Sequence, residues 1–144
     1  MEDEIAGKNM IEIACGCAEF SICASEKAGT VTCIDLVDQR LLPEIGMREN
    51  IKSEKMDATA MKYADDTFDI AVIYNAVGHL ESVLPKVLKE CLRVVKREGM
   101  IYIISSSKMD KYVIHSSLIP YLDDKCIEHT YEADRIFLYV KICV

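Results

Sequence analysis

Small residues and carboxylates stand where apolar runs of this sequence stop. An apolar run over residues 11–14 stops before Gly16. Asp35 ends a β-branched run that begins at residue 30, and Asp57 follows a third, shorter run. Small residues between a strand and a helix let the backbone approach a ligand closely, and a carboxylate at a strand end can accept hydrogen bonds from both hydroxyls of a ribose. The spacing therefore favours a site for a ribose-containing ligand, with Asp57 as a further acceptor.

Two other polar residues near these positions have two interpretations each. Glu12 lies within the first apolar run and either contacts the ligand or only hydrogen-bonds the backbone of the turn. His79 follows the apolar run over 68–74 and could act as a general base, although a loop histidine without a partner is more often structural. His79 is thus the only candidate for catalysis, and the catalytic residue stays unassigned.

The seven cysteines indicate reduced thiols. Their odd number, their mostly apolar neighbours and the lack of a signal-peptide pattern are typical of a cytoplasmic protein. Cys15 and Cys17 form the only close pair, and no Cys-x-x-Cys pair or histidine cluster accompanies them. Because zinc sites need such clusters, we expect small side chains in a tight turn and no metal.

The composition predicts one globular domain over residues 1–144. With 51% hydrophobic residues among 144, the chain can bury a core without disulfides or metals. No apolar run approaches the roughly 18 residues of a membrane span, so we expect no membrane-spanning segment and no membrane partner. The formal net charge of −7 argues against non-specific nucleic-acid binding, which depends on cationic contacts to phosphates.

Strands and helices alternate along the first two thirds of the sequence. We expect strands over 11–14, 30–35, 51–56, 68–74 and 100–105. The run FDIAVIY at 68–74 is the clearest, because a parallel strand buried on both faces must be almost continuously apolar. Helices are expected over 19–28, within 36–48, and from Ser82 to about Lys96, with Lys96 and Arg97 at the negative end of the last one.

The remaining sequence predicts a helix over 112–122, broken at Pro120, and an antiparallel strand pair over 127–132 and 136–144. Strands that alternate with helices form a parallel sheet covered on both faces. The predicted fold class is therefore α/β, doubly wound and mostly parallel, with a C-terminal antiparallel hairpin. Ligands of such sheets bind beyond the carboxyl ends of the strands, where the loops at 14–18, 35–37, 57–58 and 75–79 should meet.

This order of features resembles the class I S-adenosylmethionine-dependent methyltransferases, in particular the small methyltransferase type 11 group, from about residue 9 to 105. The segment IEIACGCA at 11–18 is similar to the first motif of that family, an acidic residue followed by a glycine-rich turn. YADDTFD at 63–69 resembles the approach to its fourth strand, and LKECLRVVKREG at 88–99 its helix before the fifth strand. The resemblance implies a Rossmann-like sheet of seven strands.

The resemblance also implies the cofactor, S-adenosylmethionine, and the residues that hold it. Asp35 corresponds to the acid that binds the ribose hydroxyls. In Met56-Asp57-Ala58, the carboxylate would accept the exocyclic amine of adenine and the next backbone N–H would meet the ring. The candidate cofactor-binding residues are Glu12, Ala14, Cys15, Gly16, Asp35, Leu36, Asp57, Ala58 and Asn75.

Departures from the family pattern bear on activity. Ala14 and Ala18 replace two of the three usual glycines. We expect both at negative φ, where a change to glycine would cost up to ~1 kcal/mol of stability; the alternative is that their methyl groups crowd the cofactor.

After Asn75 the sequence lacks the Pro-Pro-aromatic motif of amino-methylating relatives, which gives no support to methylation of nucleic-acid bases. About ten residues precede the first strand, fewer than in most relatives, so we expect a homodimer, a different subunit or a large substrate to complete the site.

Three functions fit this pattern. The leading one is methyl transfer to a small-molecule or protein acceptor, a reaction that mainly requires alignment of the nucleophile and exclusion of water. The second is a non-catalytic methyltransferase-like subunit that binds a partner. The third is a nicotinamide-dependent oxidoreductase, but its G-x-G-x-x-G turn is replaced here by residues 14–19, ACGCAE.

Overall fold

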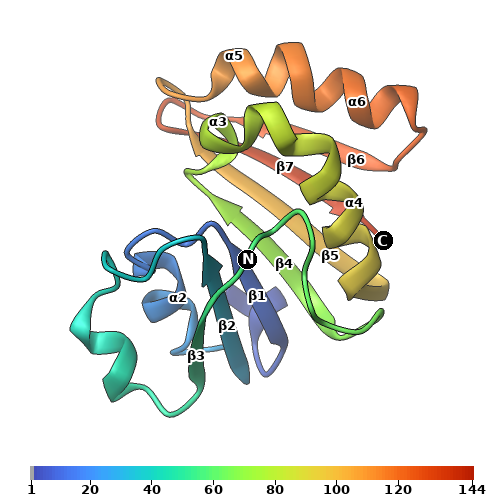
Figure 1. Ribbon diagram of the computed structural model, residues 1–144. Coiled ribbons are helices and arrows are strands. Elements are labelled where there is room, and N and C mark those ends of the chain that lie inside the picture. Colours follow the sequence, from blue (N-terminus) through green and yellow to red (C-terminus); the bar gives the residue numbers. More distant parts are fainter. Residues whose placement is uncertain (1) are drawn as a thin grey trace.

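A seven-stranded sheet forms the centre of the protein. The structure is a computed structural model that describes residues 2–144, and Figure 1 shows the sheet between its helices. The strands are β1 (Asn9–Ile13), β2 (Thr30–Asp35), β3 (Ile51–Lys55), β4 (Phe68–Tyr74), β5 (Val95–Ser106), β6 (His129–Ala133) and β7 (Phe137–Cys143). Strands β1 to β5 are parallel, and β7 is antiparallel to both β5 and β6. The predicted α/β, mostly parallel sheet with a C-terminal antiparallel hairpin is confirmed.

The strand order is β3-β2-β1-β4-β5-β7-β6. The chain starts at β1, moves outward to β3, and then returns to place β4 on the other side of β1. The direction of winding therefore reverses between β1 and β4. Open parallel sheets bind ligands beyond the carboxyl ends of the strands at such a reversal.

Helices cover both faces of the sheet. The short helices α1 (Glu2–Ile5) and α2 (Glu19–Ala24) lie on one face. The other face carries α3 (Val77–Leu80), the 3-10 helix η2 (Glu81–Val83), α4 (Leu84–Val94), and the continuous run of α5 (Lys111–Val113), the π-helix η3 (Ile114–Leu118) and α6 (Ile119–Asp124). A 3-10 helix, η1 (Pro43–Met47), lies between β2 and β3. Within residues 2–144, every helix is too short or too polar to traverse a lipid bilayer.

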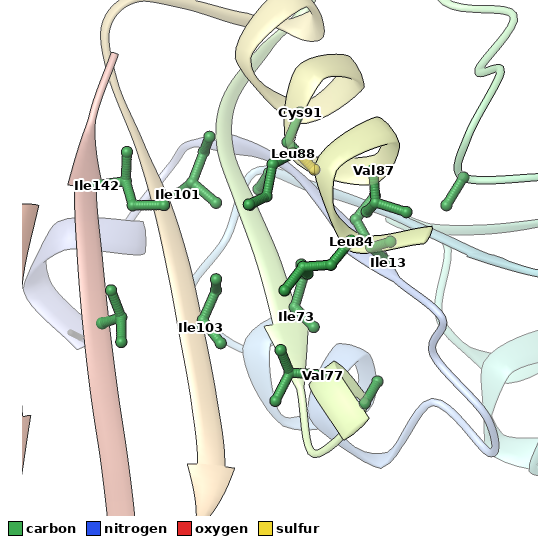
Figure 2. Packing of buried hydrophobic residues seen from close by; sticks show 14 of the residues in the cluster. Ile13, Ile73, Val77, Leu84, Val87, Leu88, Cys91, Ile101, Ile103 and Ile142 are labelled. Carbon is green, nitrogen blue, oxygen red and sulfur yellow. The ribbon is translucent and has the colours of Figure 1, made fainter. Parts of the chain in front are cut away.

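The central strands supply side chains to two separate cores. Figure 2 shows Ile73 of β4 and Ile101 and Ile103 of β5 packed beneath α4. The alternate residues of β4, Ile70 and Val72, face the core beneath α1 and α2. Successive side chains of a strand point to opposite faces, so burial on both faces requires the almost continuous apolar sequence of β4.

The helix before β5 is shorter than its sequence predicts. Helix α4 ends at Val94, and Lys96 and Arg97, expected at its C-terminal end, lie in β5 instead. Val95 has an extended backbone (φ −85°, ψ 136°) and pairs with Phe68 of β4. Two β-branched residues in succession favour a strand, and the ammonium group of Lys96 donates a hydrogen bond to Asp69 of β4 at 2.8 Å.

The helical segment after β5 also differs from the prediction. It continues past Pro120, which occupies the first turn of α6, where a backbone N–H is not required. The π-helix η3 directly precedes that turn, so the wider coil accommodates the proline ring without a break. Helix α1, before β1, was not predicted; its Ile5 is buried in the core beneath α2.

Candidate functional site

A cavity of about 600 Å³ opens at the carboxyl ends of β1, β2 and β4, where the winding reverses. Small-molecule sites commonly have such volumes. The structure brings all nine sequence candidates together in its wall: Glu12, Ala14, Cys15, Gly16, Asp35, Leu36, Asp57, Ala58 and Asn75. His79 lines the same cavity. They meet because they come from the ends of four neighbouring strands, or from the loops that follow them.

The turn after β1 has three residues in the left-handed region. They are Ala14 (φ 55°), Gly16 (φ 57°) and Ala18 (φ 64°). The expectation of negative φ at both alanines is therefore wrong. Long-range hydrogen bonds impose this shape, since Cys15 donates its backbone N–H to the carbonyl of Ile34 at 3.0 Å.

The two alanines of this turn lie in different surroundings. Ala14 is half-buried and lines the cavity. Ala18 is fully buried and packs with Cys15, Cys33 and Ile45. Only the methyl group of Ala14 is thus placed where it could meet a ligand.

Asp35 connects the end of β2 to the turn after β1. Its Oδ2 accepts the backbone N–H of Gly16 at 2.8 Å, and its Oδ1 accepts that of Val37 at 3.2 Å. Arg40 lies 3.8 Å from the same carboxylate, whose side chain is 12% exposed. A carboxylate has about four lone-pair positions, so Asp35 is fixed in place and still has capacity for the two hydroxyls of a ribose.

Glu12 is a buried carboxyl group in the floor of the cavity, with 1% of its surface exposed. Its Oε2 accepts the backbone N–H of Ser21 at 3.0 Å and also the Ser21 hydroxyl. Glu12 therefore binds the first turns of α2 rather than the backbone of its own turn. Burial raises the pKa of this carboxyl to about 7, although both hydrogen bonds from Ser21 oppose the shift.

The loop after β3 presents Asp57 at the surface. Its Oδ1 accepts both the backbone N–H and the hydroxyl of Thr59 at 2.8 Å. These hydrogen bonds lower the pKa of the carboxyl group below its usual range. The flanking residues Met56 and Ala58 are buried in the core beneath α4, so the loop turns its apolar side chains inward and its carboxylate outward.

An arginine on α4 holds the chain that follows Asp57. The guanidinium of Arg93 donates to the carbonyls of Tyr63 at 2.7 Å and Met61 at 2.9 Å. It also pairs with Glu90, whose carboxylate accepts the backbone N–H of Met61 at 2.7 Å. The resemblance had marked the segment that contains Arg93, but its contacts with this loop could not be read from the sequence.

The end of β4 supplies Asn75 and His79. Asn75 has φ 49°, and its Oδ1 accepts the backbone N–H of Ser106 at 2.9 Å, which fixes the end of β4 to the end of β5. His79 is exposed, and its imidazole has no hydrogen-bond partner among residues 2–144. Its position at the cavity keeps it a candidate base, but nothing in the described chain orients the ring.

Two aromatic residues of the cavity wall were not among the sequence candidates. Phe20 of α2 and Tyr74 at the end of β4 stack with ring centroids 5.3 Å apart and an interplanar angle of 29°. Phe20 lies in the helix that the sequence predicts over 19–28. Its place one residue into the helix after the glycine turn was the signal that could have indicated it.

The cavity therefore fits a ligand that joins a ribose to a planar base. Asp35 has free acceptor positions for the ribose, while the exposed Asp57 and the backbone of Ala58 lie at the end of the next strand. Apolar side chains of α4 and its approach, Val83 and Val87, complete that wall. Among residues 2–144, no group of three or more His, Cys, Asp or Glu side chains could hold a metal ion.

A strand-end cavity on a sheet of this order defines a doubly wound α/β protein with its ligand site at the point where the winding reverses. The family model described as "Methyltransferase domain" matches residues 11–103. The chain belongs to this family, the class I S-adenosylmethionine-dependent methyltransferases, and S-adenosylmethionine is the cofactor of the family.

Two curated relatives illustrate the similarity. The demethylmenaquinone methyltransferase of Alkalihalophilus pseudofirmus is 31% identical over 113 residues, which cover 71% of this chain and 46% of the relative. The demethylmenaquinone methyltransferase of Staphylococcus epidermidis is 30% identical over 110 residues, or 71% of this chain and 44% of the relative. The chain thus spans about half the length of the curated relatives it matches.

Solved structures agree on the fold. A methyltransferase from Aquifex aeolicus, described as dependent on S-adenosylmethionine, superposes with a TM-score of 0.81 over 95% of this chain and 82% of that protein, at 19% identity. The similarity at this level of identity concerns the arrangement of strands and helices.

Proposed function

We propose that this chain binds S-adenosylmethionine in the strand-end cavity and transfers its methyl group to an acceptor at the side of β4. One observation carries the proposal: the nine residues that the family resemblance selects, from four separate strand ends, line a single cavity of about 600 Å³. A chance set of residues spread from 12 to 75 would not converge in this way.

The residues of the cavity divide into two groups. One would bind the nucleoside of S-adenosylmethionine, and the other would lie near its amino-acid part and its reactive methyl group. Asp35 would hold the ribose, and Asp57 with the backbone of Ala58 would hold the adenine. The turn at Gly16 would lie against the amino-acid part, where the absence of a side chain permits close approach. Asn75 would mark the side from which the acceptor enters.

When bound, S-adenosylmethionine supplies a methyl group on a positively charged sulfur, which is already a good electrophile. The protein therefore needs to align the acceptor and to exclude water. Phe20, Tyr74 and Leu80 form apolar walls suited to both tasks. His79, which lines the same cavity, would receive a proton from an acceptor hydroxyl.

The names of the relatives support an apolar acceptor. Both are demethylmenaquinone methyltransferases, and the stacked rings of Phe20 and Tyr74 suit a planar apolar molecule. We propose an acceptor of this kind, with the reduced, quinol form of demethylmenaquinone as the first compound to test, because the ring carbon of a quinol is nucleophilic, whereas that of a quinone is not. A second subunit that completes the acceptor side remains a prediction.

Calorimetric titration with S-adenosylhomocysteine, NAD and NADP tests the cofactor site. We expect S-adenosylhomocysteine alone to bind, with at least micromolar affinity. Asp35→Ala should weaken binding roughly ten- to a hundredfold, because hydrogen bonds to a charged group contribute about 1.5–3 kcal/mol. Asp124→Ala, on the exposed end of α6, is the matched control. No binding at millimolar ligand, or equal affinity in Asp35→Ala, would contradict the proposal.

The non-catalytic alternative is favoured by one feature, the methyl group of Ala14 in the cavity wall. Transfer of a radiolabelled methyl group from S-adenosylmethionine to the quinol form of demethylmenaquinone, kept reduced during the assay, separates the two functions. Binding of S-adenosylhomocysteine without transfer to this or other apolar acceptors would support the partner-binding subunit.

A further inference from the structure

Three exposed apolar side chains of this protein lie in two adjoining segments. Six large apolar side chains are exposed among the described residues, and Met109, Tyr112 and Ile136 belong to two adjoining segments, with exposed fractions of 69%, 76% and 64%. Ser107 donates its backbone N–H to the carbonyl of Ile136 at 2.8 Å and its hydroxyl to that of Arg135 at 3.1 Å. These bonds join the start of the α5 segment to the turn between β6 and β7, which lie side by side in Figure 1.

Basic residues alternate with these apolar ones. We call the combined surface the basic–apolar patch; its members are Lys108, Met109, Lys111, Tyr112, Arg135 and Ile136, all exposed. The patch carries three cations on a chain whose formal net charge is −7.

The two acids nearest in sequence to the patch, Asp110 and Asp134, differ in exposure. Asp110 is buried, with 6% of its surface exposed. Asp134 is exposed, but its Oδ1 turns back to accept the backbone N–H groups of Ile136 and Phe137, each at 2.7 Å. The three cations of the patch therefore outnumber the one exposed carboxylate beside it, that of Asp134.

The opposite end of the same helical segment has the reverse character. Asp123 and Asp124 are exposed at the end of α6, and Lys125 is paired with Asp124 at 3.0 Å. An anionic surface would attract the segment at its first end and repel it at its last. An anionic surface would therefore face the edge of the protein at the start of this helical segment, not the edge at its end.

The attracted edge is the one beside the cavity. Gly78 of α3 packs so closely against the start of α5 that a Cβ at this glycine would lie 2.5 Å from the Asp110 carboxylate. The residues after Gly78, His79 and Leu80, line the cavity. The patch and the acceptor side of the cavity are thus joined by one contact.

We propose that the basic–apolar patch docks the protein on an anionic lipid bilayer and places the acceptor side of the cavity next to the membrane surface. Lysine and arginine pair with anionic headgroups, while tyrosine, methionine and isoleucine enter the boundary between headgroups and acyl chains. The proposal deepens the proposed function and rests on its apolar acceptor, since such an acceptor dissolves in the bilayer and would otherwise have to cross water.

Vesicle sedimentation with the full chain tests this proposal. Vesicles of phosphatidylcholine alone are compared with vesicles that contain phosphatidylglycerol at three parts in ten. We expect binding to the anionic vesicles, weakened by salt, and little binding to the neutral ones. Lys108→Gln with Lys111→Gln should weaken anionic binding roughly thirtyfold, because each basic residue near an anionic surface contributes about fivefold.

A second pair of substitutions tests the apolar part. Met109→Ser with Tyr112→Ser should reduce vesicle binding at least about tenfold, because both side chains would otherwise bury apolar area. Matched controls are Met47→Ser, which removes an apolar side chain that is 77% exposed in η1, and Lys27→Gln with Lys89→Gln, which remove two charges elsewhere. Neither control should change binding.

Several outcomes would overturn the docking proposal. They are no binding to anionic vesicles, equal binding by the patch variants, or concentration-dependent dimers in light scattering that only the patch variants lose. The last would assign the patch to a second copy of the chain. Titration of S-adenosylhomocysteine on the same samples keeps the two proposals distinct, since the cavity can bind its ligand whether or not the patch binds a membrane.

Discussion

The turn after β1 and the loop after β3 both meet carboxylates at the cavity, but these carboxylates are held in opposite ways. In the turn region, Glu12 is 1% exposed and bonds to Ser21, and Asp35 bonds to the backbone of Gly16. In the loop, Asp57 is exposed, and within residues 2–144 its carboxylate accepts hydrogen bonds from Thr59 alone. The loop is held instead by the side chain of Arg93 from α4, which is 30% exposed.

The difference shows two ways to build one binding site. Buried hydrogen bonds fix the turn rigidly, but a buried carboxyl group is easily protonated, so this wall is sensitive to pH. Exposed hydrogen bonds leave the carboxylates of the loop ionised at neutral pH and are individually weaker. We therefore expect the turn to respond to pH and the loop to respond to loss of its arginine.

The largest expected effect concerns Glu12. Its pKa is raised from 4.5 to about 7 by burial, so the folded protein binds a proton that the unfolded chain has already released. The stability from this proton is present below pH 4.5 and is lost as the pH rises through about 7. Linkage gives a fall of about 3 kcal/mol in the free energy of unfolding between those limits. Glu12→Gln, neutral at every pH, should lack this fall in urea titrations from pH 5 to 8.

Glu19→Gln is the control for this experiment, since Glu19 is an exposed acid in the first turn of α2. It should keep the fall seen in the parent protein. The carboxyl groups of Asp57 and Glu90 have lowered pKa values, so their titration lies at more acid pH and does not overlap this window. Parallel stability curves for the parent and Glu12→Gln would show that Glu12 is ionised in the fold.

The next largest effect concerns Arg93. Arg93→Ala removes donors to the carbonyls of Met61 and Tyr63 and should weaken binding of S-adenosylhomocysteine about tenfold, because the loop that carries Asp57 loses its support. Arg93→Lys should recover only part of the loss, since lysine cannot reproduce the forked donors of a guanidinium. Arg97→Ala, an exposed arginine of β5, should bind normally. Equal affinity in Arg93→Ala would mean that the loop holds its shape without α4.

Much of the fold could be predicted because the central strands can be recognised from their own residues, without contacts to distant parts of the chain. β2 and β4 occupy the predicted residues, since continuous apolar or β-branched runs have few other solutions. The start of β5 was misplaced because Lys96 and Arg97 also suit a helix end. Only the pairing of Val95 with Phe68 decides between the two, and that contact is distant in sequence.

Part of the cavity wall could be predicted from the sequence, but the contacts within it could not. Strand ends and small residues located the cavity wall, because parallel strands place their carboxyl ends at one edge. The partner of Glu12 and the support of the loop by Arg93 depend on contacts between separate elements. The positive φ of Ala14 and Ala18 has the same origin, as the turn is pulled into shape by Ile34 and Asp35.

The smallest expected effect separates the two alanines of the turn. A residue with a side chain loses about 1–2 kcal/mol of stability in the left-handed region, and a change to glycine removes that loss. The same change lowers stability by about 0.4–1 kcal/mol, because glycine raises the entropy of the unfolded chain. Ala14→Gly should therefore raise the free energy of unfolding by about 0.5–1 kcal/mol. Ala18→Gly also removes a fully buried methyl group, a loss of about 0.8 kcal/mol, and should be nearly neutral.

Ala133→Gly, in exposed strand β6, should destabilise by about 0.5–1 kcal/mol. Thermal melts measure these changes in stability, and destabilisation by Ala14→Gly would contradict the left-handed turn. Calorimetric titration of the same variants with S-adenosylhomocysteine shows whether the Ala14 methyl group meets the ligand. If it does, Ala14→Gly should bind this ligand more tightly.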